Sequence, residues 1–183
     1  TLNSFTYIMG IKSKFLWARL LPRSLVLNTA TLGGIGNRSF MPGTLGSILG
    51  FFLYAIIFHY LNPFFYGILM LVFAYVAAGI CDAAEYHLKE KDPSAIILDE
   101  FVAIPFLFIG LNAYNPNVVE LNAWPIYIGG FLLFRFFDIL KPFGIARLQK
   151  LEGGVGCVAD DLVSALVTCL LLHGYVLTQI PSQ

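Results

Sequence analysis

The chain has little charge and little cysteine. Only 12% of its 183 residues are charged, and eleven basic residues balance eleven acidic ones. A chain with zero formal net charge has no general attraction to nucleic acid, so we expect no nucleic-acid partner. Its cysteines are Cys81, Cys157 and Cys169, and none of them belongs to a CxxC pair. This pattern argues against a disulfide framework or a zinc site and favours reduced, structural thiols.

Hydrophobic residues make up 58% of the chain, and the mean hydropathy is +0.78. This composition is typical of membrane proteins, in which a helix of about 20 apolar residues crosses the bilayer. Four stretches are long enough to cross: 45–61, 64–81, 124–140 and 162–177. A further apolar run, 101–114, would extend only about 21 Å as a helix. It either crosses with help from neighbouring residues, a thinner bilayer or a kink at Pro105, or it forms a re-entrant segment.

The positions of the basic residues distinguish these alternatives. With five crossings and a cytoplasmic N-terminus, all eleven Lys and Arg residues fall on the cytoplasmic side, as the positive-inside rule predicts. A re-entrant third segment would place Lys89 and Lys91 opposite Lys141, Arg147 and Lys150. We therefore predict an all-α, polytopic membrane bundle of about five transmembrane or part-spanning helices.

The N-terminal stretch has a different composition from the rest. Residues 5–27 mix Phe, Ile, Trp and Leu with Lys12, Lys14, Arg19 and Arg23. This mixture suits an amphipathic helix in the headgroup layer, anchored by Trp17, and it suits an ordinary packed helix equally well. We expect an N-terminal interfacial segment, 1–30, followed by a single membrane-embedded domain, 31–183.

Acidic residues gather where the apolar segments begin or end. Asp99 and Glu100 precede the third segment, Asp138 ends the fourth, and Asp160 and Asp161 open the fifth. Capping of the helix dipole explains acids at a helix start, but helix C-termini disfavour anions such as Asp138. Arg135 and Lys141 stand three residues on either side of Asp138, so they share its helix face and can compensate it.

Five carboxylates at one membrane surface would repel each other strongly if they met without a cation. Oxygen ligands without cysteine or clustered histidine favour a hard ion, Mg²⁺ or Mn²⁺. We therefore predict a metal and catalytic site built from Asp99, Glu100, Asp138, Asp160 and Asp161. Glu85 and Asp92, in the connection before the third segment, are candidates for a supporting role around the metal.

Two glycine-containing segments precede apolar helices and are candidates for phosphate binding. In the first, 37–47, the candidates are Asn37, Thr44 and Ser47. The hydroxyls of Thr44 and Ser47 stand at a helix start beside free backbone N–H groups. A turn with a helix cap is the commoner role of such a sequence. The second, 153–156, has the same two interpretations. Arg135 and Lys141 would neutralise the bound phosphate.

Five motifs of the chain, taken in order, resemble the phosphatidylglycerophosphatase A family. They are Pro42-Gly43-Thr44-Leu45-Gly46-Ser47, Asp92-Pro93 leading to Leu98-Asp99-Glu100-Phe101, Phe134-Arg135-Phe136-Phe137-Asp138-Ile139-Leu140-Lys141-Pro142, Gly153-Gly154-Val155-Gly156, and Asp160-Asp161-Leu162. Ala103, Gly144 and Glu152 depart from the family pattern, and none of them replaces a carboxylate. The resemblance implies a Mg²⁺-dependent phosphatase of the bacterial inner membrane that converts phosphatidylglycerophosphate to phosphatidylglycerol.

We therefore expect a multi-pass lipid phosphatase whose active site faces the cytoplasm and whose partner is its phospholipid substrate. The alternative is a small ion- or proton-coupled transporter that uses intramembrane carboxylates. The acids stand at segment ends on one predicted face, which argues against a pathway through the bilayer. The sequence leaves the oligomeric state open.

Overall fold

The computed structural model describes residues 14–114 and 116–180, and these residues form helices and connecting turns without a strand. The longer helices are α3 (Arg23–Ala30), α5 (Pro42–Ile56), α6 (Pro63–Leu88), α7 (Leu98–Phe106), α9 (Gly130–Leu140) and α10 (Gly154–Thr178). Shorter elements connect or flank them: α2 (Leu16–Arg19), α4 (Ile35–Arg38), η1 (Phe58–Tyr60), η2 (Leu111–Ala113), α8 (Pro116–Leu121), π-helical η3 (Pro125–Gly129) and η4 (Pro142–Lys150). The predicted all-helical bundle is confirmed.

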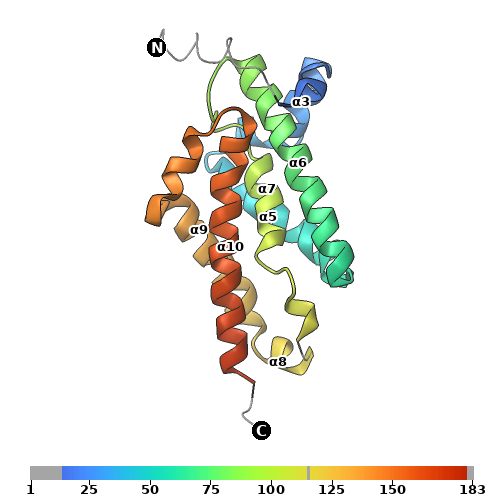
Figure 1. The fold of residues 1–183 in the computed structure, drawn as a ribbon, viewed down its shortest axis with the longest axis vertical. Coiled ribbons are helices and arrows are strands. Elements are labelled where there is room, and N and C mark those ends of the chain that lie inside the picture. The colour runs from blue at the N-terminus through green and yellow to red at the C-terminus, as the bar shows by residue number, and fades with distance from the viewer. Residues whose placement is uncertain (1–13, 115, 181–183) are drawn as a thin grey trace.

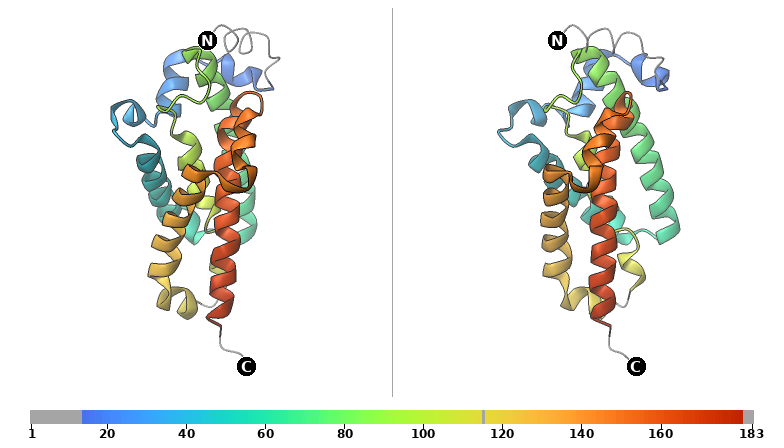
Figure 2. Two further views of the ribbon diagram at one scale, coloured as in Figure 1. Left: turned by 90° about the vertical axis from the view of Figure 1, so that its left-hand side faces the viewer. Right: turned by 60° about the vertical axis from the view of Figure 1, so that its left-hand side comes forward.

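The chain passes five times along the long axis of the bundle (Figure 1). α5 runs away from the end that carries α3, and α6 returns to it. α7 and the residues after it lead to α8 at the far end, α9 comes back, and α10 runs down again. Figure 2 places α2 and α3 at one end of the molecule and the end of α10 at the other.

Within the part of the chain that the structure describes, three segments are long and apolar enough to cross a membrane: Pro42–Tyr60, Pro63–Leu88 and Gly154–Thr178. They cover three of the four long stretches expected from the sequence, apart from Leu61 at the end of the first. The fourth, 124–140, consists of η3 and α9 and does not form one regular α-helix. α7 has nine residues and rises only about 14 Å. Five crossings therefore remain a prediction that the alternating passes support.

α7 occupies the centre of the bundle, where it contacts α5, α6 and α10. Its residues Val102, Ala103, Ile104 and Pro105 are buried. α7 ends at Phe106, one residue after Pro105. Because proline lacks an amide N–H, the carbonyl four residues earlier, that of Phe101, loses its helical hydrogen bond. The Pro105 carbonyl accepts hydrogen bonds from the Tyr66 hydroxyl of α6 and from the Phe108 amide. α7 is thus a half-length helix whose polar start lies inside the protein.

Glycines on one side of α5 allow α7 to come close. A Cβ atom on Gly46 would lie 2.8 Å from the carbonyl oxygen of Ile97, and one on Gly50 would lie 2.5 Å from that of Phe101. Small residues at such positions let helix backbones approach more closely than larger side chains allow. The contact brings the start of α5 beside the first turn of α7.

The N-terminal helices pack on α6. Trp17 stacks on Tyr75 with ring centroids 6.0 Å apart, and Arg19 Nε forms a 2.8 Å ion pair with the buried Asp82. The predicted helix over 5–27 begins outside the described residues, and its described part is divided between α2 and α3. These contacts support the packed-helix interpretation for α2 and α3.

The second glycine segment, 153–156, brings α10 close to α6. A Cβ atom on Gly154 would lie 1.9 Å from the Ala78 carbonyl oxygen, and Gly153 adopts a φ of +65°, which favours glycine. None of the four residues lines the cleft described below. Helix packing, and not phosphate binding, explains these glycines.

Replacing Gly50 with Ala should lower the thermal unfolding midpoint of the purified protein. The added methyl group would meet the Phe101 carbonyl and Ile104, and overpacking of this kind costs about 1–3 kcal/mol. Circular dichroism of the detergent-solubilised protein measures the midpoint. Gly67→Ala in α6 is the matched control, because its methyl group would have no described neighbour within 4 Å. A midpoint for Gly50→Ala at or above that of Gly67→Ala would contradict the close α5–α7 contact.

Candidate active site

All five predicted carboxylates meet at one cleft of about 280 Å³. The cleft lies where α5, α7 and α10 begin and α9 ends, so four segments far apart in sequence contribute to it. Six carboxylates line it, including Asp92, together with two cationic side chains, Arg135 and Lys141. Its lining residues are Pro42, Gly43, Asp92, Pro93, Ser94, Ile96, Asp99, Glu100, Arg135, Asp138, Lys141, Cys157, Asp160 and Asp161.

Three of the carboxylates form a compact group, which we call the acidic triad: Asp99, Glu100 and Asp161. One oxygen from each lies within 4.8 Å of the other two. The first turn of α7 supplies Asp99 and Glu100, and α10 supplies Asp161. Asp99 and Asp161 are buried, so little water is available to screen their charges.

The other two predicted carboxylates are bound to the cationic side chains. Arg135 Nη1 donates to Asp138 Oδ2 at 2.6 Å. Lys141 forms an ion pair with Asp160, and its Nζ lies 3.9 Å from Asp138 Oδ1. Burial alone would lower the pKa of Lys141, but the hydrogen bond to Asp160 and the charges of Asp160, Asp161 and Asp138 raise it above its usual value. Lys141 therefore stays protonated and neutralises part of the cleft.

The acidic triad has no such partner. Within the described part of the chain, none of the ion pairs reaches Asp99, Glu100 or Asp161. Glu100 Oε2 is buried without a hydrogen-bond partner there. A carboxylate oxygen that is buried and unpaired, beside two further carboxylates, fits a hard divalent cation, which takes oxygen ligands.

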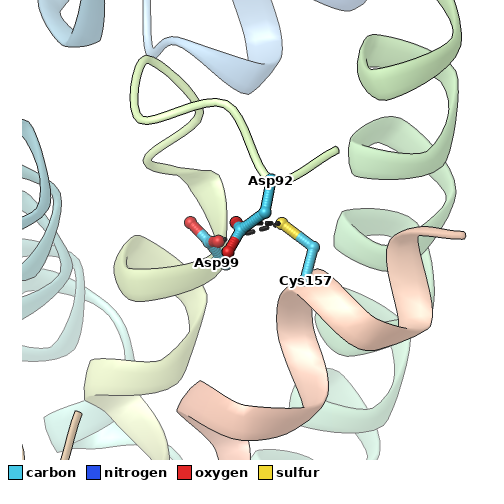
Figure 3. Close-up of side chains that lie close together, drawn as sticks. All are labelled: Asp92, Asp99 and Cys157. Carbon is cyan, nitrogen blue, oxygen red and sulfur yellow. Dashed lines mark hydrogen bonds between the residues drawn. The ribbon is translucent and has the colours of Figure 1, made fainter. Parts of the chain in front are cut away.

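Cys157 lies directly beside Asp99 of the acidic triad (Figure 3). Its Sγ donates to Asp99 Oδ2 at 3.0 Å and lies 3.8 Å from Asp92 Oδ1. One potential ligand atom from each of these three residues lies within 4.8 Å of the others. Sequence reasoning treated Cys157 only as a structural thiol. Its position four residues before Asp161 was the available signal, because residues at this spacing share a helix face.

Glu85 and Asp92, the two residues predicted to support the site, are joined to each other. Glu85 Oε1 accepts a hydrogen bond from the Asp92 amide at 2.9 Å, and Asp92 has a positive φ of 51°. Gln149 Nε2 of η4 donates to Asp92 Oδ2 at 3.1 Å. Asp92 lines the cleft, whereas the buried Glu85 fixes the backbone behind it.

None of the three predicted phosphate-binding residues of the first glycine segment lines the cleft. Ser47 is buried; its hydroxyl donates to the Gly43 carbonyl at 2.9 Å and accepts from Arg135 Nη1 at 3.3 Å. Asn37 is exposed on α4, and neither it nor Thr44 lines the cleft. Ser47 therefore holds Arg135 in place, and Gly43 is the residue of its segment that borders the acids.

A sequence profile of the phosphatidylglycerophosphatase A family matches residues 28–176. The chain belongs to this family. Its members are phosphatases, and the three long apolar helices associate this chain with a membrane. The resemblance expected from the motifs is confirmed, and it extends over α5, α7, α9 and α10, which form the cleft.

Curated relatives carry two different substrate names. A Bacteroides thetaiotaomicron protein provisionally named a phosphatidylinositol-3-phosphatase is 33% identical over 82% of this chain and 93% of its own length. A phosphatidylglycerophosphatase A of Haemophilus influenzae is 33% identical over 72% of the chain and 76% of its own. That of Escherichia coli K12 is 27% identical, over 76% and 77%. No solved structure matches the chain.

Replacing Gly43 with Ala should lower phosphatase activity at least about tenfold, because small displacements of reacting groups are costly. The methyl group would lie 2.3 Å from Glu100 Oε1 and 3.2 Å from Arg135 Nη2. Phosphate release by the purified variant measures the effect. Gly174→Ala in α10, whose methyl group would have no described neighbour within 4 Å, is the control. Equal activity of the two variants would show that Gly43 does not shape the site.

Proposed function

We propose that the protein hydrolyses the terminal phosphomonoester of phosphatidylglycerophosphate, giving phosphatidylglycerol and phosphate, with Mg²⁺ as its metal. The observation that carries this proposal is the acidic triad, which forms no ion pair within the described part of the chain. The chain belongs to a family of lipid phosphatases. Two curated relatives are named for this activity. The third relative's name also refers to a phosphomonoester on a lipid headgroup, so the chemistry is shared and the headgroup differs.

The metal would be held by Asp99, Glu100 and Asp161. Mg²⁺ prefers oxygen ligands and usually binds one or two protein carboxylates, with water and substrate phosphate completing its shell. Mn²⁺ takes the same oxygen donors. When bound, the ion would supply charge neutralisation for the phosphate and lower the pKa of a bound water.

Arg135 and Lys141 would bind the phosphoryl oxygens. Arg135 uses Nη1 for Asp138 and Ser47, which leaves other donors of its planar guanidinium for a phosphate. Asp138 and Asp160 hold the two cations in place. Asp160 Oδ1 is buried without a hydrogen-bond partner in the described structure, so it is the oxygen that we assign to accept a proton from the attacking water. As the water oxygen bonds to phosphorus, the bond from phosphorus to the glycerol oxygen breaks, and that oxygen takes the proton from Asp160.

We further propose a multi-pass protein of the bacterial inner membrane, with its cleft facing the cytoplasm. The cleft lies where α5, α7 and α10 begin and α9 ends. Basic residues occur around this region: Lys89 follows α6, Lys141 follows α9, and Arg147 and Lys150 belong to η4. Basic residues at membrane-helix ends favour the cytoplasmic side. A lipid phosphate at that surface would reach the cleft without crossing the bilayer core.

A transporter fits these positions less well. The six carboxylates of the cleft are gathered at one end of the helices, whereas a transport pathway needs ionisable groups near the midplane. Glu120 belongs to α8, which lies at the opposite end of the bundle (Figure 1).

Purified protein in detergent should release phosphate from phosphatidylglycerophosphate faster than from phosphatidic acid, lysophosphatidic acid or phosphatidylinositol 3-phosphate. The release should stop with a chelator and return with Mg²⁺, because the acidic triad needs a cation. A membrane gradient should not be required. Faster release from phosphatidylinositol 3-phosphate would show that this lipid is the preferred substrate. Release that continues in the chelator would show that hydrolysis does not depend on a metal ion.

Replacing Asp99 or Asp161 with Asn should lower the rate of phosphate release by at least about 100-fold, a loss typical of removing electrostatic stabilisation from an active site. Glu120→Gln, the same kind of change at the other end, should keep the wild-type rate. Chromatographic elution as wild type would show that the variants are folded. Wild-type rates in both Asn variants would defeat the site assignment.

A further inference from the structure

A second cavity lies at the opposite end of the bundle from the acidic cleft. It has a volume of about 340 Å³, within the range of small-ligand pockets, about 300–1,000 Å³. We call it the tyrosine pocket, because Tyr54, Tyr114 and Tyr127 line it together with His59 and Glu120. These residues come from α5, η1, the turn before α8, α8 itself and η3. The phosphatase chemistry proposed above uses none of them.

Contacts behind the pocket fix its aromatic rings. Tyr54 and Tyr127 have ring centroids 6.1 Å apart, and both rings pack near Phe108. His173 Nε2 lies 2.8 Å from the Ile109 carbonyl oxygen, so this nitrogen is the donor. His173 Nδ1 then accepts the Tyr114 hydroxyl at 2.9 Å. The pocket is thus a preformed set of aromatic surfaces.

The charge of the pocket is unbalanced. Among the residues that line the pocket, Glu120 is the one with a carboxylate. No Lys or Arg occurs in 39–88, 92–134 or 151–183, and all residues of the pocket belong to these ranges. The ion pairs of the described structure do not include Glu120. Aromatic faces are negative as well, so both parts of the lining attract a cation. Among the described residues no Lys or Arg lines the pocket, and His59 is its one side chain that could become positive.

The surroundings of the pocket are suited to lipid. Tyr60, Trp124 and Ile128, which adjoin the lining residues in sequence, are 79%, 76% and 46% exposed. A smaller cavity of about 250 Å³ shares Tyr54, His59 and Tyr127 and is also lined by Tyr60. Exposed tryptophan and tyrosine are enriched at the membrane–water interface, where lipid headgroups lie.

We propose that the tyrosine pocket binds the ammonium group of an aminophospholipid headgroup, with Glu120 as its counter-ion and Tyr54, Tyr114 and Tyr127 as its aromatic walls. Cages of aromatic rings recognise alkylammonium ions through cation–π attraction. A single carboxylate among aromatic rings is a poor site for Mg²⁺, which needs several oxygen ligands. If the acidic cleft faces the cytoplasm, this pocket holds a lipid of the outer leaflet.

Native mass spectrometry of the detergent-solubilised protein tests this proposal. The protein is mixed with equal amounts of phosphatidylethanolamine, its uncharged N-acetyl derivative and phosphatidylglycerol, all with the same acyl chains. Phosphatidylethanolamine should be retained at least about threefold more than the other two, since one exposed cation–π contact contributes about 0.5–1 kcal/mol. Equal retention of the three lipids by the wild-type protein would overturn the proposal.

Variants assign the binding to the pocket. Tyr127→Leu removes an aromatic face and Glu120→Gln removes the charge, so both should reduce the preference to near equality. Tyr127→Phe keeps the ring and should keep the preference. Phosphate release by Glu120→Gln should stay at the wild-type rate, which separates this result from any failure of the catalytic assignment. An unchanged preference in both Tyr127→Leu and Glu120→Gln would contradict the proposal.

A competition experiment distinguishes binding of the whole lipid from binding of its free headgroup. Glycerophosphoethanolamine carries the same ammonium group without acyl chains, and it should not displace phosphatidylethanolamine at equal concentration. Displacement at equal concentration would show that the pocket takes a soluble ammonium compound, and the lipid assignment would be wrong.

Discussion

Repulsion between buried carboxylates is the constraint on which the rest of the structure depends. Two unit charges about 4 Å apart interact by about 4 kcal/mol at an effective dielectric constant near 20. Asp99, Glu100 and Asp161 lie within 4.8 Å of one another, and three ionised groups at this spacing would take up much of the 5–15 kcal/mol that stabilises a typical domain. Asp138 and Asp160 avoid the problem through Arg135 and Lys141. The remaining three have no ion-pair partner among the described residues, and their spacing is one that can hold a metal ion.

The short α7 makes this arrangement compatible with a membrane. A helix long enough to span the bilayer would need a longer apolar part after Asp99 and Glu100, or it would draw these two acids away from the membrane surface. α7 ends at Phe106 instead, and the Tyr66 hydroxyl of α6 donates a hydrogen bond to the Pro105 carbonyl there. Gly46 and Gly50 let α5 pack directly against it. The acidic first turn of α7 can therefore lie inside the bundle, next to the end of α9 and the start of α10.

The sequence predicted that the five acidic residues lie close together. It did not predict which of them pair with a cationic side chain and which form the acidic triad. Asp99, Glu100, Asp138, Asp160 and Asp161 stand at segment ends, so helix direction and the positive-inside rule place them together. Which of them pairs with Arg135 or Lys141 depends on side-chain contacts between helices that spacing does not specify. The same holds for Cys157, whose contact with Asp99 crosses from α10 to α7.

Glycine and hydroxyl residues were harder to interpret from sequence. Gly153 and Gly154 and the Thr44–Ser47 region have the composition of a phosphate loop, but close helix packing requires the same residues. Only the position of the neighbouring backbone distinguishes the two uses. The end of α7 was also missed, because apolar composition continues beyond Phe106 while the helix does not.

Binding of Mn²⁺, counted by electron paramagnetic resonance of the purified protein, tests the central claim most directly. Mn²⁺ takes the same oxygen ligands as Mg²⁺ and reports occupancy without any turnover. The wild-type protein should bind the ion, Mg²⁺ should displace it, and Asp161→Asn should weaken binding at least about tenfold, whereas Glu120→Gln should not. Equal Mn²⁺ affinity in Asp161→Asn and wild type would contradict a metal site at the acidic triad.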